Sequence, residues 1–333
     1  MSPAVGAEPL LEIRDLTVEY HRGRGRSPVR AVDGASLSVS AGQAVGLVGE
    51  SGSGKSTLAL TTLGLVPSAS GAIRFDGHDL VSIDRRARRE LGRHLQAVFQ
   101  DPNSSLNPAR TIEQTLAEPL EVHERLPRAE KRRRIAVMLE QVGLPARAGE
   151  RYPTEFSGGQ RQRIAIARAL MVSPKLVICD EAVSALDLSV QAQILNLLAD
   201  LQRELGVAYL FVSHDLAVVR HLCSHAVVLY RGQVMEHGPV EVVCERPRHP
   251  YTQALLSAVL PPDPGDPGIA ALRPVARVTN GSGRHHSCCP YHDRCPQAVA
   301  LCAQERPELR TGGAGTAAAC HLVLGSATTA PAE

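Results

Sequence analysis

The stretch AVGLVGESGSGKSTLALTT at residues 44–62 decides the fold. Within it, residues 49–56 fit the pattern G-x-x-x-x-G-K-[ST], between an apolar run of strand length and a run that predicts a helix. Glycines in such a loop let successive backbone N–H groups converge on phosphate oxygens, and the positive end of the helix adds to the attraction. A glycine-rich turn without function is the alternative, but the complete match in this context favours a nucleoside triphosphate site.

The residue types in this loop have distinct expected parts in binding. Lys55 can reach the β- and γ-phosphates, and the hydroxyl of Ser56 can bind Mg²⁺. We expect the nucleotide to contact Gly49, Ser51, Gly52, Ser53, Gly54, Lys55, Ser56 and Thr57.

A second apolar run, LVICD at residues 176–180, ends in acidic residues. Asp180 stands where a Walker B carboxylate would hold Mg²⁺, directly or through water. Glu181 follows outside the strand and could polarise an attacking water as a general base. Two acids after a strand would otherwise form a charge pair at a helix N-terminus, but the phosphate loop favours the catalytic interpretation.

The order of the predicted elements indicates an α/β protein. Strands are predicted over residues 10–20, 36–40, 44–48 and 72–75, with a basic helix at 85–93. Strand signals then disappear between about 101 and 175, where helices are predicted over 111–124, 128–142 and 157–171. From residue 176 to 230, apolar strands alternate with helices, a pattern typical of a mostly parallel sheet covered on both sides. The helix over 189–205 should bury one face, made of Val190, Ile194, Leu197, Leu198, Leu201 and Leu205.

The composition narrows the possible classes of function. The net charge of +2 excludes a strong polyanion-binding field over the whole chain, and the 3% of aromatic residues offers few rings for stacking nucleic-acid bases. The N-terminus lacks the pattern of a signal peptide, and the longest apolar runs are far too short to span a membrane. We therefore expect a soluble cytosolic protein whose eight cysteines are reduced thiols or metal ligands.

The segment FSGGQRQR at residues 156–163 resembles the signature motif of ABC-transporter ATPases. The other motifs of that family appear in order along the chain, as Tyr20 for the adenine-stacking aromatic, Gln100 for the Q-loop, SALD at 184–187 for the D-loop and His214 for the switch histidine. The resemblance covers about residues 8–260. It implies a P-loop ABC ATPase core with a mostly parallel sheet, an antiparallel β subdomain and a helical subdomain at about 101–175.

The resemblance also implies a head-to-tail dimer with two ATP molecules at the interface. Each ATP would contact the phosphate loop of one subunit and the signature helix of the other, here Ser157, Gly158, Gly159 and Gln160. Ser157 and Gln160 fit a capping box as well, and the two roles are compatible. The remaining roles implied by the family are Mg²⁺ binding by Ser56, Gln100 and Asp180, nucleotide contact by Asp187, and placement of the attacking water by Glu181 and His214.

Four segments narrow the resemblance to the ATP-binding subunits of dipeptide, oligopeptide or nickel importers, namely residues 31–57, 100–108, 184–198 and 249–259. Ala182 and Phe156 depart from the family pattern without removing a catalytic group. The implied function is ATP hydrolysis that energises import of peptides, at the cytoplasmic face of the membrane. The implied partners are a second ATPase subunit, two transmembrane permease subunits and an extracytoplasmic solute-binding protein, with no nucleic acid.

Three alternatives stay open in decreasing order. The first is an importer of nickel or another small solute in the same family. The second is an ABC ATPase acting on DNA, but the interval between phosphate loop and signature has room only for the helical subdomain. The third is a subunit that binds ATP without turnover, which the presence of Glu181 and His214 argues against.

A Cys-rich extension is expected over residues 288–323, after a Pro- and Gly-rich linker at 261–287 and before a disordered end at 324–333. Its spacing matches neither zinc-finger nor ferredoxin patterns. The resemblance to some peptide-importer ATPases implies a [4Fe–4S] cluster, with Zn²⁺ or a metal-free tail as the alternatives. The ligands would be Cys289, Cys295, Cys302 and Cys320.

Overall fold

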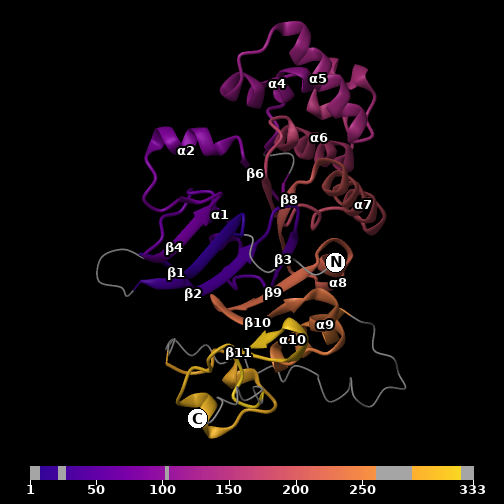
Figure 1. The fold of residues 1–333 in the computed structure, drawn as a ribbon. Helices are drawn as coiled ribbons and strands as arrows, with labels where there is room; N and C mark the ends of the chain where they lie inside the picture. Colours follow the sequence, from indigo (N-terminus) through magenta and orange to yellow (C-terminus); the bar gives the residue numbers. More distant parts are fainter. Residues whose placement is uncertain (1–7, 22–27, 102–104, 260–286, 324–333) are drawn as a thin grey trace.

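The computed structural model describes residues 8–21, 28–101, 105–259 and 287–323 (Figure 1). The strands are β1 Leu11–Tyr20, β2 Val29–Val39, β3 Ala44–Val48, β4 Ser70–Phe75, β5 His78–Asp79, β6 Leu95–Val98, β7 Leu176–Asp180, β8 Ala208–Ser213, β9 His225–Tyr230, β10 Gln233–Pro239, β11 Arg310–Thr311 and β12 Ala317–Ala318. The α-helices are α1 Lys55–Thr62, α2 Arg85–Gly92, α4 Ile112–His123, α5 Arg128–Gln141, α6 Gly158–Leu170, α7 Leu188–Leu205, α8 Leu216–Leu222, α9 Val240–Glu245 and α10 Pro250–Val259.

The larger sheet has the strand order β11-β12-β10-β9-β3-β8-β7-β6. The pairs β9–β3, β3–β8, β8–β7 and β7–β6 are parallel, and the strands from β9 outward to β11 pair antiparallel. Every residue of β3 and β8 is buried. Such runs are apolar throughout because both faces of a central parallel strand are covered.

A second, antiparallel sheet has the order β2-β1-β4-β5. Its apolar residues, including Leu11, Ile13 and Phe75, form one core with Val45 and Leu47 from β3 and with α1. Because the side chains of a strand alternate, Ala44 and Val48 of β3 belong to the other core cluster. The two sheets therefore enclose α1 and fix the loop that precedes it.

Helices α4, α5 and α6 lie at one end of the molecule, and the described residues of the C-terminal extension lie at the opposite end (Figure 1). The helices predicted over 111–124, 128–142 and 157–171 are confirmed to within one residue at each end. The predicted linker at 261–287 falls outside the described residues except for its last position, as does the whole of 324–333.

Four strands of the larger sheet were not expected from the sequence: β6, β10, β11 and β12. Strand β6 reads LQAV and is mostly half-buried, and β10 reads QVMEHGP, with a Gly and a Pro at its end. Neither has the continuous apolar run that predicts a buried strand. Among the residues that the structure describes, no helix combines the length and the apolar character needed to cross a membrane.

Candidate functional site

The phosphate loop opens into a cavity of about 520 Å³ between the antiparallel sheet and the carboxyl ends of the parallel strands. Nine of the predicted nucleotide-binding or catalytic residues line this cavity: Tyr20, Ser51, Gly52, Gly54, Lys55, Ser56, Thr57, Gln100 and Glu181. They come from β1, from the loop after β3, from α1 and from the ends of β6 and β7. The fold thus gathers residues that are up to 161 positions apart, counting from Tyr20 to Glu181.

Two glycines of the loop are required by close backbone contacts. A Cβ atom on Gly49 would lie 2.1 Å from the carbonyl oxygen of Leu229. Gly54 has a φ of 106°, and a Cβ there would lie 2.2 Å from the carbonyl oxygen of Ala31. Gly54 precedes α1 and makes no side-chain cap, so the first N–H groups of the helix point to the loop without a competing side chain.

Lys55 is held under the loop by its own backbone. Its ammonium donates to the carbonyl oxygens of Gly49 at 2.8 Å and Glu50 at 3.0 Å, and the residue is only 4% exposed. Burial lowers the pKa of Lys55, while the carboxylates of Glu181, Asp180 and Glu50 act in the opposite direction. A buried cation beside a loop of N–H donors is suited to a phosphate anion.

Ser56, which lines the cavity, is hydrogen-bonded to Asp180, which lies behind it. The Ser56 hydroxyl donates to Oδ1 of Asp180 at 3.0 Å. Partial burial raises the pKa of Asp180, and the hydrogen bond from Ser56 opposes that shift. A partly buried carboxylate next to a hydroxyl oxygen offers the hard oxygen ligands that Mg²⁺ prefers, so these residues fit that ion.

The proposed water-placing residues lie beside this pair. Oε1 of Glu181 is 4.0 Å from Nδ1 of His214, and the Glu181 backbone has a φ of 49° that turns the chain sharply after β7. Glu181 lines the cavity, whereas His214 is 56% exposed and does not. Gln100 donates from Nε2 to the Ser184 hydroxyl at 3.1 Å. The Q-loop and D-loop segments are therefore in direct contact.

Four residues that line the cavity were not predicted from the sequence. Val29, Arg30 and Ala31 lie on β2, and Arg231 follows β9 with a φ of 47°. Tyr20 stands at the same rim, 41% exposed, with its hydroxyl 3.5 Å from that of Thr57. No local pattern marks Arg231, because only the pairing of β9 with β3 brings it to the phosphate loop.

The signature residues lie elsewhere. Ser157 accepts from the Gln160 N–H at 3.3 Å, and Gln160 accepts from the Ser157 N–H at 3.0 Å, which confirms the predicted capping box of α6. Gly159 is needed because a Cβ would lie 2.4 Å from a methyl of Val190. Asp187 caps α7 by accepting from the Val190 N–H at 3.0 Å, and this bond holds the pKa of Asp187 below its usual value.

Several residues that were predicted for the nucleotide site do not line the 520 Å³ cavity: Gly49, Ser53, Ser157, Gly158, Gly159, Gln160, Asp180 and Asp187. Gly49, Ser53 and Asp180 lie behind it, in the loop and at the end of β7. The phosphate loop and the signature helix thus form separate surfaces within one chain.

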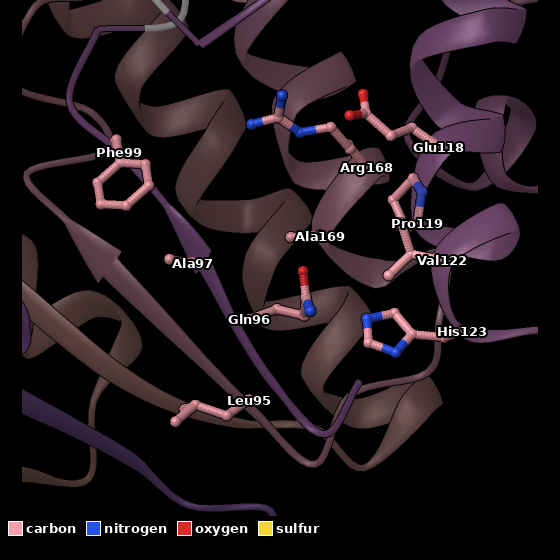
Figure 2. Close-up of a pocket in the computed structure, with 10 residues that line it drawn as sticks. All are labelled: Leu95, Gln96, Ala97, Phe99, Glu118, Pro119, Val122, His123, Arg168 and Ala169. Carbon is pink, nitrogen blue, oxygen red and sulfur yellow. The ribbon is translucent and has the colours of Figure 1, made fainter. Parts of the chain in front are cut away.

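A second cavity, of about 330 Å³, lies between β6, α4 and α6 (Figure 2). Figure 2 shows Arg168 beside Glu118 on one side of it and Gln96 and His123 on the other. Burial lowers the pKa of Arg168, and the Glu118 carboxylate opposes this shift. The remaining lining residues are mostly apolar: Leu95, Ala97, Phe99, Pro119, Val122 and Ala169.

The C-terminal cysteines come from separate turns of the extension. The Cys289 N–H donates to the Cys302 carbonyl oxygen at 2.9 Å. Burial raises the pKa of the Cys289 thiol to about 11, and the thiols of Cys302, Cys295 and Cys320 are close enough to add to the shift. Within the described ranges, however, no three His, Cys, Asp or Glu side chains are grouped closely enough to hold a metal ion.

Two ranges of the chain match known protein families. Residues 32–184 match the family described as ABC transporter. Residues 235–302 match the family described as oligopeptide/dipeptide transporter, C-terminal region. The first range spans the phosphate loop and the signature motif, and the second spans β10 and most of the cysteines.

Individual relatives are similar over nearly the whole length. The di/tripeptide transport ATP-binding protein DppF of Pseudomonas aeruginosa is 45% identical, over 91% of this chain and 94% of that protein. A putative peptide import ATP-binding protein of Brucella abortus is 44% identical, over 95% of each chain.

Solved structures share the fold. The ATP-binding cassette MJ0796, in a dimeric post-hydrolysis state bound to ADP and Pi, is 29% identical with a TM-score of 0.63, over 69% of this chain and 98% of that chain. The protein cbiO1 of Clostridium perfringens, part of an ABC transporter complex, is 29% identical with a TM-score of 0.64, over 72% of this chain and 93% of that chain.

Proposed function

Because this chain belongs to the ABC transporter family, and its relatives are named as peptide import ATP-binding proteins, we propose that it is the ATP-hydrolysing subunit that energises a membrane importer of peptides. The observation that carries this function is the cavity in which Lys55, Ser56 and Glu181 converge. Its residues supply a phosphate cradle, a Mg²⁺ site and a base within one space.

Binding of ATP is assigned to the loop and its neighbours. The N–H groups at the start of α1 and the ammonium of Lys55 would receive the β- and γ-phosphates. Tyr20 at the rim would stack on the adenine. Ser56 and Asp180, with Gln100, would hold Mg²⁺, which neutralises charge on the phosphates.

Hydrolysis is assigned to the acidic end of β7. Glu181 would accept a proton from the attacking water, because its carboxylate lines the cavity next to Ser56 and Lys55. His214, 4.0 Å from Glu181, would contact the γ-phosphate and help to orient that water. The contact between Gln100 and Ser184 would transmit a change in the nucleotide site between the Q-loop and the D-loop.

The signature residues are proposed to act on a second subunit. Ser157, Gly158, Gly159 and Gln160 open α6 away from the cavity of their own chain, and Asp187 is used as the cap of α7. A helix start of this kind attracts a γ-phosphate presented by another ATPase subunit. That subunit is a second copy of this chain or a homologous one.

The membrane partner is proposed to dock near the cavity of Figure 2. This cavity is bounded by β6 and α4, which lie just before and just after residues 100–108 in the sequence; residues 102–104 of that stretch lie outside the described residues. Its mostly apolar lining, with the charged side chains of Arg168 and Glu118 at its edge, suits a short helix of a permease subunit. Two such subunits, with an extracytoplasmic solute-binding protein, complete the importer, and this chain lies peripherally at the cytoplasmic face.

Within the chain, we propose residues 8–260 as the nucleotide-binding domain, with the helical subdomain at about 101–175. Residues 288–323 would then be a separate extension. The boundary is supported by the position of the three helices α4 to α6 at one end of the molecule and of the extension at the other (Figure 1).

The extension is proposed to bind a [4Fe–4S] cluster or Zn²⁺ through Cys289, Cys295, Cys302 and Cys320. The thiols of Cys295, Cys302 and Cys320 lie near enough to Cys289 to raise its pKa, which supports this. As they stand they do not form a ligand set, and the raised pKa of Cys289 disfavours the thiolate that a metal needs. Anaerobic purification with iron, sulfide and zinc analysis tests the idea, with Cys302→Ser as control, and a metal-free wild-type protein would contradict it.

The importer function is tested by ATP hydrolysis and peptide uptake in proteoliposomes that contain the chain and its permease subunits. We expect ATP-dependent uptake of dipeptides or oligopeptides that stops with Glu181→Gln. Uptake of Ni²⁺ without peptide uptake would favour the nickel alternative. ATP hydrolysis that DNA stimulates and permeases do not would favour a non-transport ABC ATPase.

A further inference from the structure

The C-terminal extension places an arginine directly on the phosphate loop. Nη1 and Nη2 of Arg294 donate to Oε2 and Oε1 of Glu50 at 2.8 and 2.9 Å. Glu50 is the second residue of the G-x-x-x-x-G-K-[ST] loop, 244 positions earlier in the chain. The pairing is bidentate, which is the strongest geometry between these two side chains. The hydrogen bonds with Glu50 are the largest cause of a raised pKa of Arg294.

The peptide groups of Glu50 are held as well. Its N–H donates to the hydroxyl of Tyr251 at 2.9 Å, and its carbonyl oxygen accepts from Lys55 Nζ at 3.0 Å. The side chain of Glu50, its backbone and the phosphate-binding lysine are therefore one hydrogen-bonded unit. A movement of Glu50 would displace the carbonyl oxygen that orients Lys55.

The arginine is itself rigidly placed. Tyr291 of the extension packs against Tyr230 and Tyr251 of the core, with ring centroids 5.3 Å apart in both cases, and all three rings are buried. Arg294 lies against the rings of Tyr230 and Tyr291. A second bridge runs from Arg231, which lines the nucleotide cavity, to the Pro290 carbonyl oxygen at 3.3 Å.

The charge on Glu50 explains why such a clamp matters. A phosphate loop attracts anions through its N–H groups, and a carboxylate inside that loop repels the same anions. Glu50 is near enough to Lys55 for its charge to influence the pKa of that lysine. A guanidinium bound to both oxygens of the carboxylate neutralises this repulsion before the nucleotide arrives.

From these contacts we infer that Arg294 is a positioning residue of the nucleotide site, and that the C-terminal extension sets the nucleotide affinity of the phosphate loop through it. The inference rests on the proposed ATPase function. It gives the extension a part in ATP binding that does not depend on what its cysteines hold.

The test is the affinity of the full chain for ATP and for a fluorescent ATP analogue in the presence of Mg²⁺, first for the wild type. Arg294→Gln should weaken binding about fivefold or more, because it leaves Glu50 unneutralised. It should raise KM more than it lowers kcat. The loss should shrink at high salt, because salt screens the uncompensated charge.

The double variant Glu50→Gln/Arg294→Gln separates charge from packing. It lacks both charges, so most of the lost affinity should return. A further control is Arg306→Gln. Arg306 is a second arginine of the extension that binds the core, because its Nη2 donates to the Asp33 carbonyl oxygen at 2.9 Å. Arg306 does not touch the loop, although its partner Asp33 also binds Arg30 of the cavity lining, so nucleotide affinity should fall far less than in Arg294→Gln. Thermal unfolding of each variant confirms that it is folded.

Wild-type affinity in Arg294→Gln would overturn the inference and leave the ATPase function intact. A double variant as weak as Arg294→Gln alone would also overturn it, since the arginine would then matter only for packing. A wild-type chain that binds no ATP would overturn the proposed function and the inference together.

Discussion

Glycine-containing motifs lie at the starts of helices α1 and α6, and the two helix starts differ in how their backbone N–H groups are satisfied. The helix α1 begins after Gly54 without a side-chain cap, and its loop opens into the 520 Å³ cavity. The helix α6 begins after Ser157, with both members of a capping box satisfied, and does not reach that cavity. The backbone N–H groups at the start of α1 have no side-chain partner from Gly54, whereas the start of α6 is satisfied by its own capping box.

The difference teaches that one chain carries two unlike halves of a site. The phosphate-loop half needs Lys55 and the carboxylates behind it, all of which are held in place here. In the proposed function, the signature half acts on a phosphate that a second subunit presents to its helix start. Changes in the first half should therefore affect binding by the isolated chain, and changes in the second should not.

The largest effect is expected from Glu181→Gln. Loss of a general base should reduce ATP turnover by about 10²- to 10⁴-fold, while ATP still binds because Lys55 and the loop are intact. The measurement is steady-state phosphate release together with nucleotide affinity. Turnover at the wild-type rate would show that Glu181 is not the base.

A smaller effect, on binding rather than turnover, is expected from Lys55→Ala. Removal of the charged hydrogen-bond donor under the loop should weaken ATP affinity by about 10- to 100-fold. Equilibrium binding to the isolated chain measures it. Lys175→Ala is the matched control, because Lys175 pairs with Asp76 away from the cavity. Equal ATP affinities of Lys55→Ala and Lys175→Ala would contradict the assignment of Lys55 to phosphate binding.

Low pH should lower the stability of the folded chain through protonation of His249. This buried imidazole accepts from the Tyr251 N–H at 3.0 Å, and burial lowers its pKa to about 4. The folded state therefore resists a proton that the unfolded chain takes up below about pH 6.5. The stabilisation is complete above that pH and falls as the pH drops toward 4, by about 2 kcal/mol between pH 7 and pH 5.

Denaturant unfolding at these two pH values measures the effect. His249→Asn keeps an acceptor near the Tyr251 N–H and removes the titrating group. Its free energy of unfolding should fall about 2 kcal/mol less than that of the wild type over the same pH range. Equal losses in the two proteins would contradict the assignment.

The parts of the fold and of the site that could be predicted are those encoded in short, local sequence patterns. The phosphate loop, the Ser157 capping box and the acids after β7 are encoded in short, contiguous patterns, and the helices of 112–170 follow their periodicity. The predicted buried face of α7 is wrong at Leu205, which is 44% exposed. It lies in the last turn, just before Gly206 ends the helix in the left-handed conformation.

The rest depends on pairings between distant segments. Arg231 reaches the cavity only because β9 pairs with β3, and Arg294 meets Glu50 only because the extension folds back on the core. Strands β6 and β10 were not predicted because neither has a continuous apolar run. Their place in the sheet depends on the strands and helices that lie next to them. No window of the sequence contains these contacts.

The central claim, that the two halves serve different nucleotides, is tested most directly with Gly158→Glu in the isolated chain. A Cβ at Gly158 meets only a methyl of Leu186 at 3.8 Å, and an acidic residue at a helix start stabilises the helix, so α6 should fold. We predict ATP affinity equal to that of the wild type in dilute, monomeric protein, although turnover in the assembled complex is lost. Weakening of ATP binding to the monomer as large as that of Lys55→Ala would contradict the account.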